Sequence, residues 1–296
     1  MTEKLKRARI GGADVTSIKA PVGVSRANAI SGARIYDVGQ GDAIAIIDDA
    51  DRTILQLDYG GRQGNPFEGK SSGEVDRMLP VTSDALVMVT HWDEDHWSTG
   101  PKGAAAKAVD WLVPRQVTSP RAVRFAADLK KVRCIPETMV GSIVEFTARN
   151  GDAILWQKIA PSSPSPSIHE NCNKTGVAVA LLRRSGARGQ VILLPGDAPF
   201  HEVPLFQHLY LAGMTLTGLV AFHHGSKYHW TDATRSMLRF WPVTPGGACD
   251  VVFSYGAGNS YGHPHPNEYA MLAARREIST PTLRTAKAPH HDILFR

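Results

Sequence analysis

Four side chains of metal-ligand type lie within six residues, in the segment His91-Trp92-Asp93-Glu94-Asp95-His96. The apolar run 84–90 precedes it, and this run predicts a buried strand that ends at His91. Functional sites are built on the loops behind such strands. Imidazole and carboxylate suit Zn²⁺, Mn²⁺ or Fe. The alternative, a solvated acidic loop with incidental histidines, suits one His near one Asp better than this density. The segment therefore predicts a site shared by two metals.

Three further clusters follow strand-like runs in the same way. Asp197 follows Pro195-Gly196 and could bridge two metals, although Gly-Asp alone is a common turn. Adjacent histidines in His223-His224-Gly225-Ser226 offer one candidate ligand. Segment 259–266, NSYGHPHP, holds His263 and His265 in a loop that its prolines and glycine stiffen. A rigid turn with surface histidines remains the alternative for that loop.

Short strands and a few helices must position these residues. The runs 33–38, 43–48 and 53–58 predict an antiparallel start, because turn-forming residues separate them. Each half of the chain has strands first and helices later, which favours two packed sheets with helices outside. We therefore expect an α/β fold with one main domain over 31–296, and an N-terminal arm or irregular hairpin over 1–30. Further strands are expected at 142–146, 153–160, 176–182, 190–197, 216–222, 250–255 and twice within 282–295, and helices after Thr99 and at 120–131, 199–213, 232–241 and 266–277.

Composition sets weaker bounds on function. The chain has 33 Lys+Arg against 28 Asp+Glu, a net charge of +5, which is compatible with a phosphate-bearing partner but is no nucleic-acid footprint. Three widely spaced cysteines predict no disulfide framework and fit a reducing compartment. The N-terminus lacks the pattern of a secretory signal, and no apolar run reaches the roughly 18 residues of a membrane span. We therefore expect a cytoplasmic protein without a transmembrane segment.

The motifs together resemble the metallo-β-lactamase superfamily, in particular the soluble hydrolase domain of ComEC-type competence proteins. The resemblance covers about residues 33–295. The segments that carry it are, in order, 36–43 (YDVGQGDA), 56–61 (QLDYGG), 91–96 (H-x-D-x-D-H), 171–175 (an Asn-x-Ser-like strand entry), 194–197 (LPGD), 223–228 (HHGSKY), 259–266 (NSYGHPHP) and the pair Arg284-Thr285.

The resemblance implies a four-layer αββα sandwich with two divalent metal ions, Zn or Mn, between the sheets. One metal would take His91, Asp93 and Asp197. The other would take Asp95, His96, Asp197 and either His223 or His224. Further implied roles are water orientation by Asp95, phosphoryl stabilisation or leaving-group protonation by His263 or His265, and substrate contacts by Ser226, Asn259 and Asn173.

Some features depart from the family pattern. The superfamily's separate ligand His before the bridging Asp is not evident, and His169 is the nearby substitute. Ala286 and Lys287 follow Arg284-Thr285, where the family often has an acidic residue. The membrane channel of ComEC-type proteins is absent, so DNA uptake is not implied.

The leading expectation is a metal-dependent phosphodiesterase or nuclease that acts on a phosphate-bearing substrate such as DNA or a nucleotide. The alternative within enzymes is hydrolysis of a small ester, lactone or amide by the same site, because fold does not fix substrate. A third class is a non-catalytic binding module, which the intact ligand set argues against. A homo-oligomer is compatible with the sequence.

Overall fold

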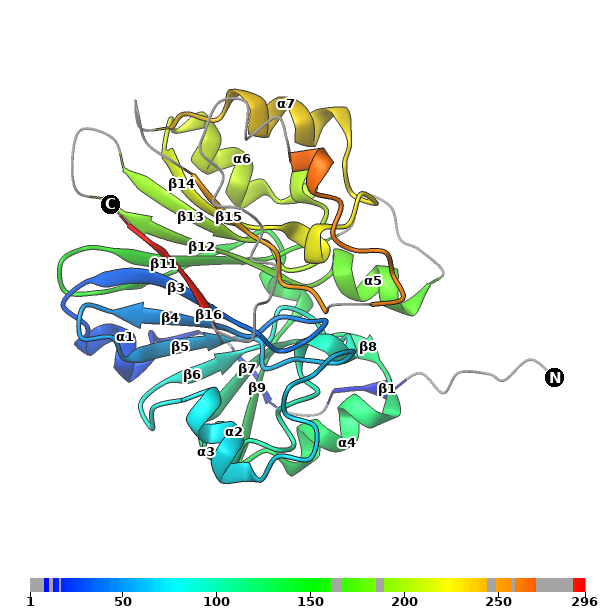
Figure 1. Cartoon of the computed structure of the whole chain (residues 1–296). Helices are drawn as coiled ribbons and strands as arrows, with labels where there is room; N and C mark the ends of the chain where they lie inside the picture. Colours follow the sequence, from blue (N-terminus) through cyan, green and yellow to red (C-terminus); the bar gives the residue numbers. More distant parts are fainter. Residues whose placement is uncertain are drawn as a thin grey trace.

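Two β-sheets packed face to face, with helices on both outer sides, make up the fold of this computed structural model (Figure 1). The structure describes residues 8–10, 13–15, 17–160, 167–184, 189–243, 249–256, 259–269 and 290–295. This arrangement confirms the expected four-layer αββα sandwich.

The larger sheet has eight strands in the order β16-β3-β4-β5-β6-β7-β9-β2. Its β16, β3, β4 and β5 pair antiparallel, as the turn-separated runs predict, and β5, β6, β7, β9 and β2 pair parallel. Its strands are β2 (Ala13–Asp14), β3 (Ile30–Tyr36), β4 (Ile44–Asp48), β5 (Thr53–Leu57), β6 (Leu86–Met88), β7 (Asp110–Pro114), β9 (Lys131–Ile135) and β16 (His290–Leu294).

The second sheet has six strands in sequence order, β10 to β15. Pairing is antiparallel from β10 to β13 and parallel from β13 to β15. Parallel neighbours end at the same edge of a sheet, which places the loops after β13 and β14 side by side. Its strands are β10 (Ile143–Thr147), β11 (Ala153–Lys158), β12 (Val177–Arg183), β13 (Gln190–Leu194), β14 (Thr215–Val220) and β15 (Asp250–Val252).

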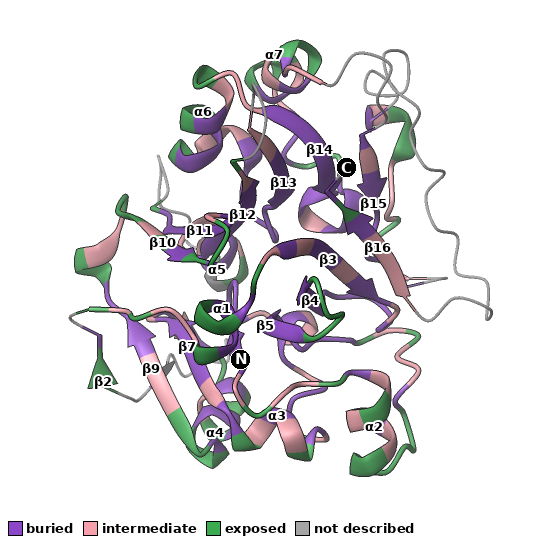
Figure 2. Cartoon of the chain, turned by 90° about the vertical axis from the view of Figure 1, so that its left-hand side faces the viewer, coloured by how far each residue is buried: buried purple, intermediate pink, exposed green. Residues whose placement is uncertain are grey.

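Helices cover the outer faces of both sheets (Figure 1). The α-helices are α1 (Val22–Arg26), α2 (Ser72–Met78), α3 (Ala104–Ala108), α4 (Pro120–Asp128), α5 (Ile168–Lys174), α6 (Pro204–Leu211) and α7 (Asp232–Phe240). The 3₁₀ helices are η1 (Glu94–His96), η2 (Glu137–Met139), η3 (Phe200–Glu202), η4 (Phe222–Gly225) and η5 (Pro266–Tyr269). In Figure 2 the strands are mostly buried and the exposed residues gather on helices and turns.

Alternation of side chains along the strands separates three apolar cores. Trp156 of β11 belongs to the core between the sheets, whereas its neighbour Leu155 faces the layer of α6 and α7. Val87 of β6 packs in a third core with Ala106 and Phe125, from α3 and α4. Each sheet therefore buries both faces, which leaves its edges and strand-end loops to carry a site.

Two expected helices differ from the structure. The helix expected at 120–131 ends at Asp128, because β9 begins at Lys131, and neither β9 nor β7 was expected. The helix expected at 199–213 is divided into η3 and α6, since Pro204 lacks an N–H and starts a new helix. In the expected helix 266–277 the structure describes η5 only, and the first expected closing strand, with Arg284 and Thr285, lies outside the described residues.

The two strands described before residue 30 pair with later strands and not with each other. The short strand β1 (Ala8–Arg9) pairs with β8 (Val117–Thr118), and β2 joins the eight-stranded sheet beside β9. The boundary at residue 30 stays a prediction. Within the described part of the chain, no helix has the length and apolarity to cross a membrane.

Candidate metal centre

One anchor of the loop after β6 is the backbone carbonyl of Asp95, in η1. This oxygen accepts hydrogen bonds from the N–H groups of Asp42 and Gly61, at 3.2 Å each. A Cβ added to Gly60 would lie 1.7 Å from the same oxygen. The loops that carry Asp42, Gly60-Gly61 and Asp95 therefore approach so closely that position 60 must be glycine, which explains the Gly pair after β5.

The two adjacent histidines after β14 point in different directions. Both have left-handed backbone conformations, with φ of 48° at His223 and 54° at His224. Their rings lie 6.1 Å apart with an interplanar angle of 81°. Consecutive residues can therefore face separate positions on either side of Asp197.

Four side chains converge in what we call the Asp95 set, which consists of Asp95, His96, Asp197 and His224. Asp197 Oδ1 lies 3.4 Å from both His96 Nε2 and His224 Nε2. Asp95 Oδ2 lies 3.3 Å from His224 Nε2, and Asp95 Oδ1 lies 4.0 Å from His96 Nε2. Ligands bound tetrahedrally at about 2.0–2.1 Å are about 3.3–3.4 Å apart, so this set has nearly the spacing of a zinc site.

Unpaired buried atoms test whether the Asp95 set fits a metal. His96 Nε2, His224 Nε2 and Asp197 Oδ1 are buried and have no hydrogen-bond partner among the described residues. Leaving such groups unpaired is costly, and a divalent cation between them would satisfy all three. The donor set of this chain therefore fits a divalent metal.

A second convergence, the Asp93 set, consists of His91, Asp93, Asp197 and His223. His91 Nε2 lies 3.7 Å from both Asp93 Oδ2 and Asp197 Oδ2. His223 Nε2 lies 3.6 Å from the same Asp197 oxygen. The spacing is slightly wider than in the Asp95 set. Asp197 thus turns Oδ1 toward one set and Oδ2 toward the other, which is the arrangement of a bridging carboxylate.

Hydrogen bonds behind the histidines fix which ring nitrogen faces the centre. Asp58 Oδ2 accepts from Thr90 Oγ1 at 2.7 Å and from His96 Nδ1 at 2.8 Å. Since the Thr90 hydroxyl proton is used there, its oxygen accepts from His91 Nδ1 at 3.1 Å. His224 Nδ1 donates to the Ser254 carbonyl at 2.8 Å. All three rings therefore engage Nδ1 away from the centre and turn Nε2 toward it, so Nε2 is the atom that binds metal once it carries no proton.

Sequence reasoning did not assign roles to two carboxylates near the centre. Asp58 is fully buried at the end of β5, and Asp42 is buried with Oδ1 3.7 Å from His224 Nδ1. Burial, opposed by His224 and His96, raises the pKa of Asp42. The positions of Asp42 and Asp58 in the sequence could have marked them as site residues, since both follow strands that end at the sheet edge carrying His91.

Three groups contact Asp93 and hold its carboxylate. His169, on the exposed side of α5, places Nδ1 2.8 Å from Asp93 Oδ1. In the amide orientation that satisfies its neighbours, Asn173 donates to Asp93 Oδ2 at 3.1 Å. Burial would raise the pKa of Asp93, but hydrogen bonds from His169 and His91 lower it. His169 thus contacts Asp93, a candidate ligand, from the exposed side of α5.

Opposite charges shift the titration of the central groups strongly. Burial would raise the pKa of Asp197, yet the nearby imidazoles of His224, His223 and His96 hold it well below its usual value. Burial would lower the pKa of His224, but Asp197 and Asp42 raise it to about 9. In the metal-free protein a proton therefore occupies a candidate ligand, and metal binding must release it.

The remaining predicted site residues lie around the Asp93 set. The His263 ring lies 5.7 Å from that of His223, and the His265 ring lies 6.1 Å from that of His263. Burial and the neighbouring His223 lower the pKa of His263 to about 4, so this ring is neutral at pH 7. Ser226 and Asn259 instead bond to backbone groups of their own loops. Their predicted substrate contacts stay predictions.

Comparisons with known proteins add solved structures at low similarity. No family model and no curated protein matches the chain by sequence. The chain is similar to Zn²⁺-bound PqqB from Methylobacterium extorquens, with 12% identity, a TM-score of 0.45 and coverage of 82% of this chain and 86% of that one. A diphosphatase of the PhnP family has 12% identity, a TM-score of 0.42 and coverage of 84% and 95%. The metallo-β-lactamase SMB-1 has 16% identity, a TM-score of 0.37 and coverage of 85% and 94%. The fold of this chain is therefore defined by its own strand order and layers.

Proposed function

We propose that this chain is a hydrolase that uses two divalent metal ions, Zn²⁺ or Mn²⁺, to cleave phosphodiesters. The observation that carries the proposal is the position of Asp197 between two ligand sets, with one oxygen toward each. The Asp95 set would hold one ion and the Asp93 set the other. His224 then belongs to the first and His223 to the second.

Bound divalent ions at these positions would supply Lewis acidity, which polarises a substrate oxygen and acidifies water. The chain's own residues supply orientation and proton handling. Asp95, whose backbone carbonyl accepts from the amides of Asp42 and Gly61, carries the carboxylate that can orient an attacking water. His263 is neutral at pH 7 and can donate a hydrogen bond to a phosphoryl oxygen.

The charge near the candidate centre favours a phosphodiester over a neutral ester, lactone or amide. Arg62 donates to the Tyr261 hydroxyl at 3.2 Å, and Lys227 follows Ser226 directly. Both cations are exposed, so each can approach an anionic substrate outside the buried centre.

Removing single carboxylates tests this proposal. Asp197→Ala should lose both metals, whereas Asp95→Ala should lose mainly the one in the Asp95 set. Activity on bis(p-nitrophenyl) phosphate should fall by roughly a hundredfold or more in each, because a lost Lewis acid removes several kcal/mol of transition-state stabilisation. Metal content by elemental analysis and hydrolysis by absorbance give the readouts. Asp128→Asn, on the exposed side of α4, is the matched surface control.

The result also separates the competing functions. About two equivalents of metal per chain with phosphodiester turnover would support the proposal. Turnover of lactones or esters alone would replace it by the small-molecule reaction. Retention of full activity and full metal content in both variants would show that the ligand assignment is wrong.

A further inference from the structure

Five aromatic rings form a row beside the candidate centre. His223, the middle ring of the row, belongs to the Asp93 set and lies 5.7 Å from the ring of His263 and 5.1 Å from that of His229. Tyr261 stacks on His263 with centroids 5.9 Å apart and an interplanar angle of 15°. Tyr228 meets His229 edge-on at 4.9 Å and 76°. The row therefore ends in a tyrosine on each side of His223.

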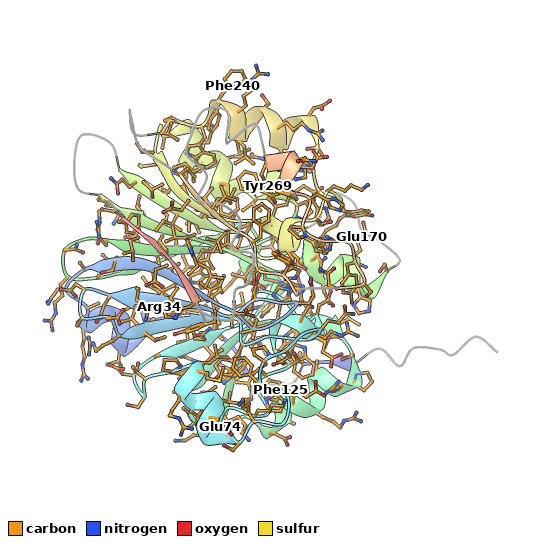
Figure 3. All side chains as sticks on the ribbon, viewed as in Figure 1. Arg34, Glu74, Phe125, Glu170, Phe240 and Tyr269 are labelled. Atoms are coloured by element: carbon orange, nitrogen blue, oxygen red, sulfur yellow. The ribbon has the colours of Figure 1, made fainter. Side chains whose placement is uncertain are left out.

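Both terminal tyrosines are exposed. Tyr228 is 68% exposed and Tyr261 is 48% exposed, although burying such rings is strongly favourable. Most other large exposed apolar residues lie far along the chain from the centre, including Phe240 on α7, which Figure 3 shows at the outer surface of the molecule. Two exposed tyrosine rings at the ends of one row beside the candidate centre therefore suggest a binding role and not scattered surface hydrophobicity.

The backbone at each tyrosine is held in place by a polar side chain. Ser226 Oγ accepts the N–H of Tyr228 at 3.1 Å. Asn259 Oδ1 accepts the N–H of Tyr261 at 3.0 Å, and Gln63 pairs with Ser260 through bonds of 3.0 and 2.8 Å. These contacts reduce the ordering cost of binding on the two rings, because both loops are already fixed.

A cation accompanies each exposed ring. Arg62 donates to the hydroxyl of Tyr261, and Lys227 immediately precedes Tyr228. Exposed aromatic rings alternating with cations are the combination that binds single-stranded nucleic acid, because bases stack on rings while cations attract phosphates. Paired bases inside a duplex have no free face to offer, so an unpaired strand fits best.

We propose that Tyr228 and Tyr261 are stacking platforms for the two bases that flank the scissile phosphodiester of a single-stranded nucleic acid. This inference rests on the proposed phosphodiesterase function and specifies its substrate. It makes the two tyrosines specificity-determining residues, while the metal sets remain the site of cleavage.

A protein–substrate cycle tests the inference. The probes are the dinucleotide thymidylyl-(3′→5′)-thymidine, its two analogues with one base removed, and the analogue with both bases removed. Tyr228→Ala and Tyr261→Ala should each lower kcat/KM for the dinucleotide about tenfold, mainly through KM, since stacking contributes about 1–3 kcal/mol per base. Each variant should lose nothing further when the base on its own side is removed. Tyr228→Phe and Tyr261→Phe should retain activity, and Phe240→Ala should match the wild type.

Other results would contradict either the stacking role of the two tyrosines or the proposed phosphodiesterase function. If the alanine variants change cleavage of the dinucleotide and of the analogue without bases equally, the tyrosines do not bind bases. Wild-type cleavage of bis(p-nitrophenyl) phosphate without cleavage of the dinucleotide would overturn the inference and leave the proposed function standing. Cleavage of none of these phosphodiesters by metal-loaded protein would overturn the proposed function itself.

Discussion

A histidine can bind a metal only if one ring nitrogen is free of protons and faces the ion. In this chain, hydrogen-bond acceptors on the Nδ1 side of the rings decide which nitrogen faces the ion. The acceptor for His96 is the carboxylate of Asp58, and the acceptor for His224 is the neutral carbonyl of Ser254. Asp58 also accepts from the N–H of Thr90 at 2.7 Å, which fixes its own orientation. The anionic acceptor increases the electron density of His96 and so strengthens it as a ligand.

Asp58→Asn tests this arrangement, because it replaces a single carboxylate oxygen by an amide nitrogen. The variant keeps the shape of the side chain but loses the charge behind His96. We expect metal affinity of the Asp95 set to fall about 10- to 100-fold, as for other carboxylates behind ligating histidines. Competition with a chromogenic chelator measures the affinity, and Asp128→Asn is the control. Equal affinity of the variant and the wild type would contradict the role given to Asp58.

At the scale of elements, α5 depends on a distant side chain for its position. Gln116, which is 5% exposed, accepts the N–H of Trp92 at 3.1 Å through Oε1. Its Nε2 donates to Cys172 O at 2.7 Å and to Thr175 Oγ1 at 2.9 Å. One amide therefore joins the loop 91–96 to the C-terminal end of the helix that carries His169 and Asn173.

Gln116→Leu should loosen this connection. The three hydrogen bonds of Gln116 are lost, which lowers the free energy of unfolding by roughly 0.5–1.5 kcal/mol each. Cys172 O still accepts from the Thr175 N–H, and Thr175 Oγ1 still donates to Asn171 O. Because α5 holds Asp93, we expect metal affinity of the Asp93 set to fall about tenfold, in the range known for groups behind metal ligands, while the Asp95 set is nearly unaffected. Calorimetric metal titration resolves the two sites, and Gln207→Leu, on the exposed side of α6, is the control. Equal weakening of both sets would indicate general destabilisation and not positioning.

The same elements show what sequence could predict. The strands near β3 to β5 and β11 to β14 were predictable, because long apolar runs between turn residues have few alternatives. Segment 131–135 was missed, since two of its five residues are charged and only its last two are buried. Segment 171–175 was interpreted as a strand entry but belongs mostly to α5, a polar helix whose position comes from Gln116. Such contacts lie far apart in sequence and leave no local pattern.

The candidate site was predictable to a similar extent. The ligand-type residues at 91–96, Asp197 and 223–224 stood out because their density after strands is unusual. Asp58 and Asp42 are single carboxylates, and only contact with His96 and His224 distinguishes them from turn residues. Sequence also left open which of His223 and His224 binds metal, because the directions of their side chains depend on two consecutive left-handed residues.

On the scale of the whole molecule, the candidate centre joins the two sheets. His91, Asp93, Asp95 and His96 follow β6 of the eight-stranded sheet, whereas Asp197, His223 and His224 follow β13 and β14 of the other. In Figure 1 these loops meet at the edge of the sandwich beside α5, and Figure 3 places Glu170 of α5 at the same edge. Metal bound there would connect the layers at a point where the apolar core between them ends.

Metal removal should therefore destabilise the whole sandwich. Ligands from both sheets come together only in the folded chain, so metal binds the native state and stabilises it by mass action, by about 2.7 kcal/mol at a hundredfold excess over Kd. For a chain of this size we expect a chelator to lower Tm by about 5 °C or more. Thermal unfolding followed by circular dichroism, with and without Zn²⁺, measures the shift.

Asp197→Ala distinguishes stabilisation by Zn²⁺ at the candidate centre from stabilisation by Zn²⁺ bound elsewhere on the protein. The variant lacks the carboxylate shared by both sets, so its Tm should be the same with Zn²⁺ and with chelator, whatever its value in the metal-free state. Asp128→Asn should show the full wild-type shift, because its carboxylate lies on the exposed side of α4. If the Tm of Asp197→Ala rises with Zn²⁺ as much as that of the wild type, the stabilising ion binds elsewhere. The candidate centre would then not be what connects the two sheets.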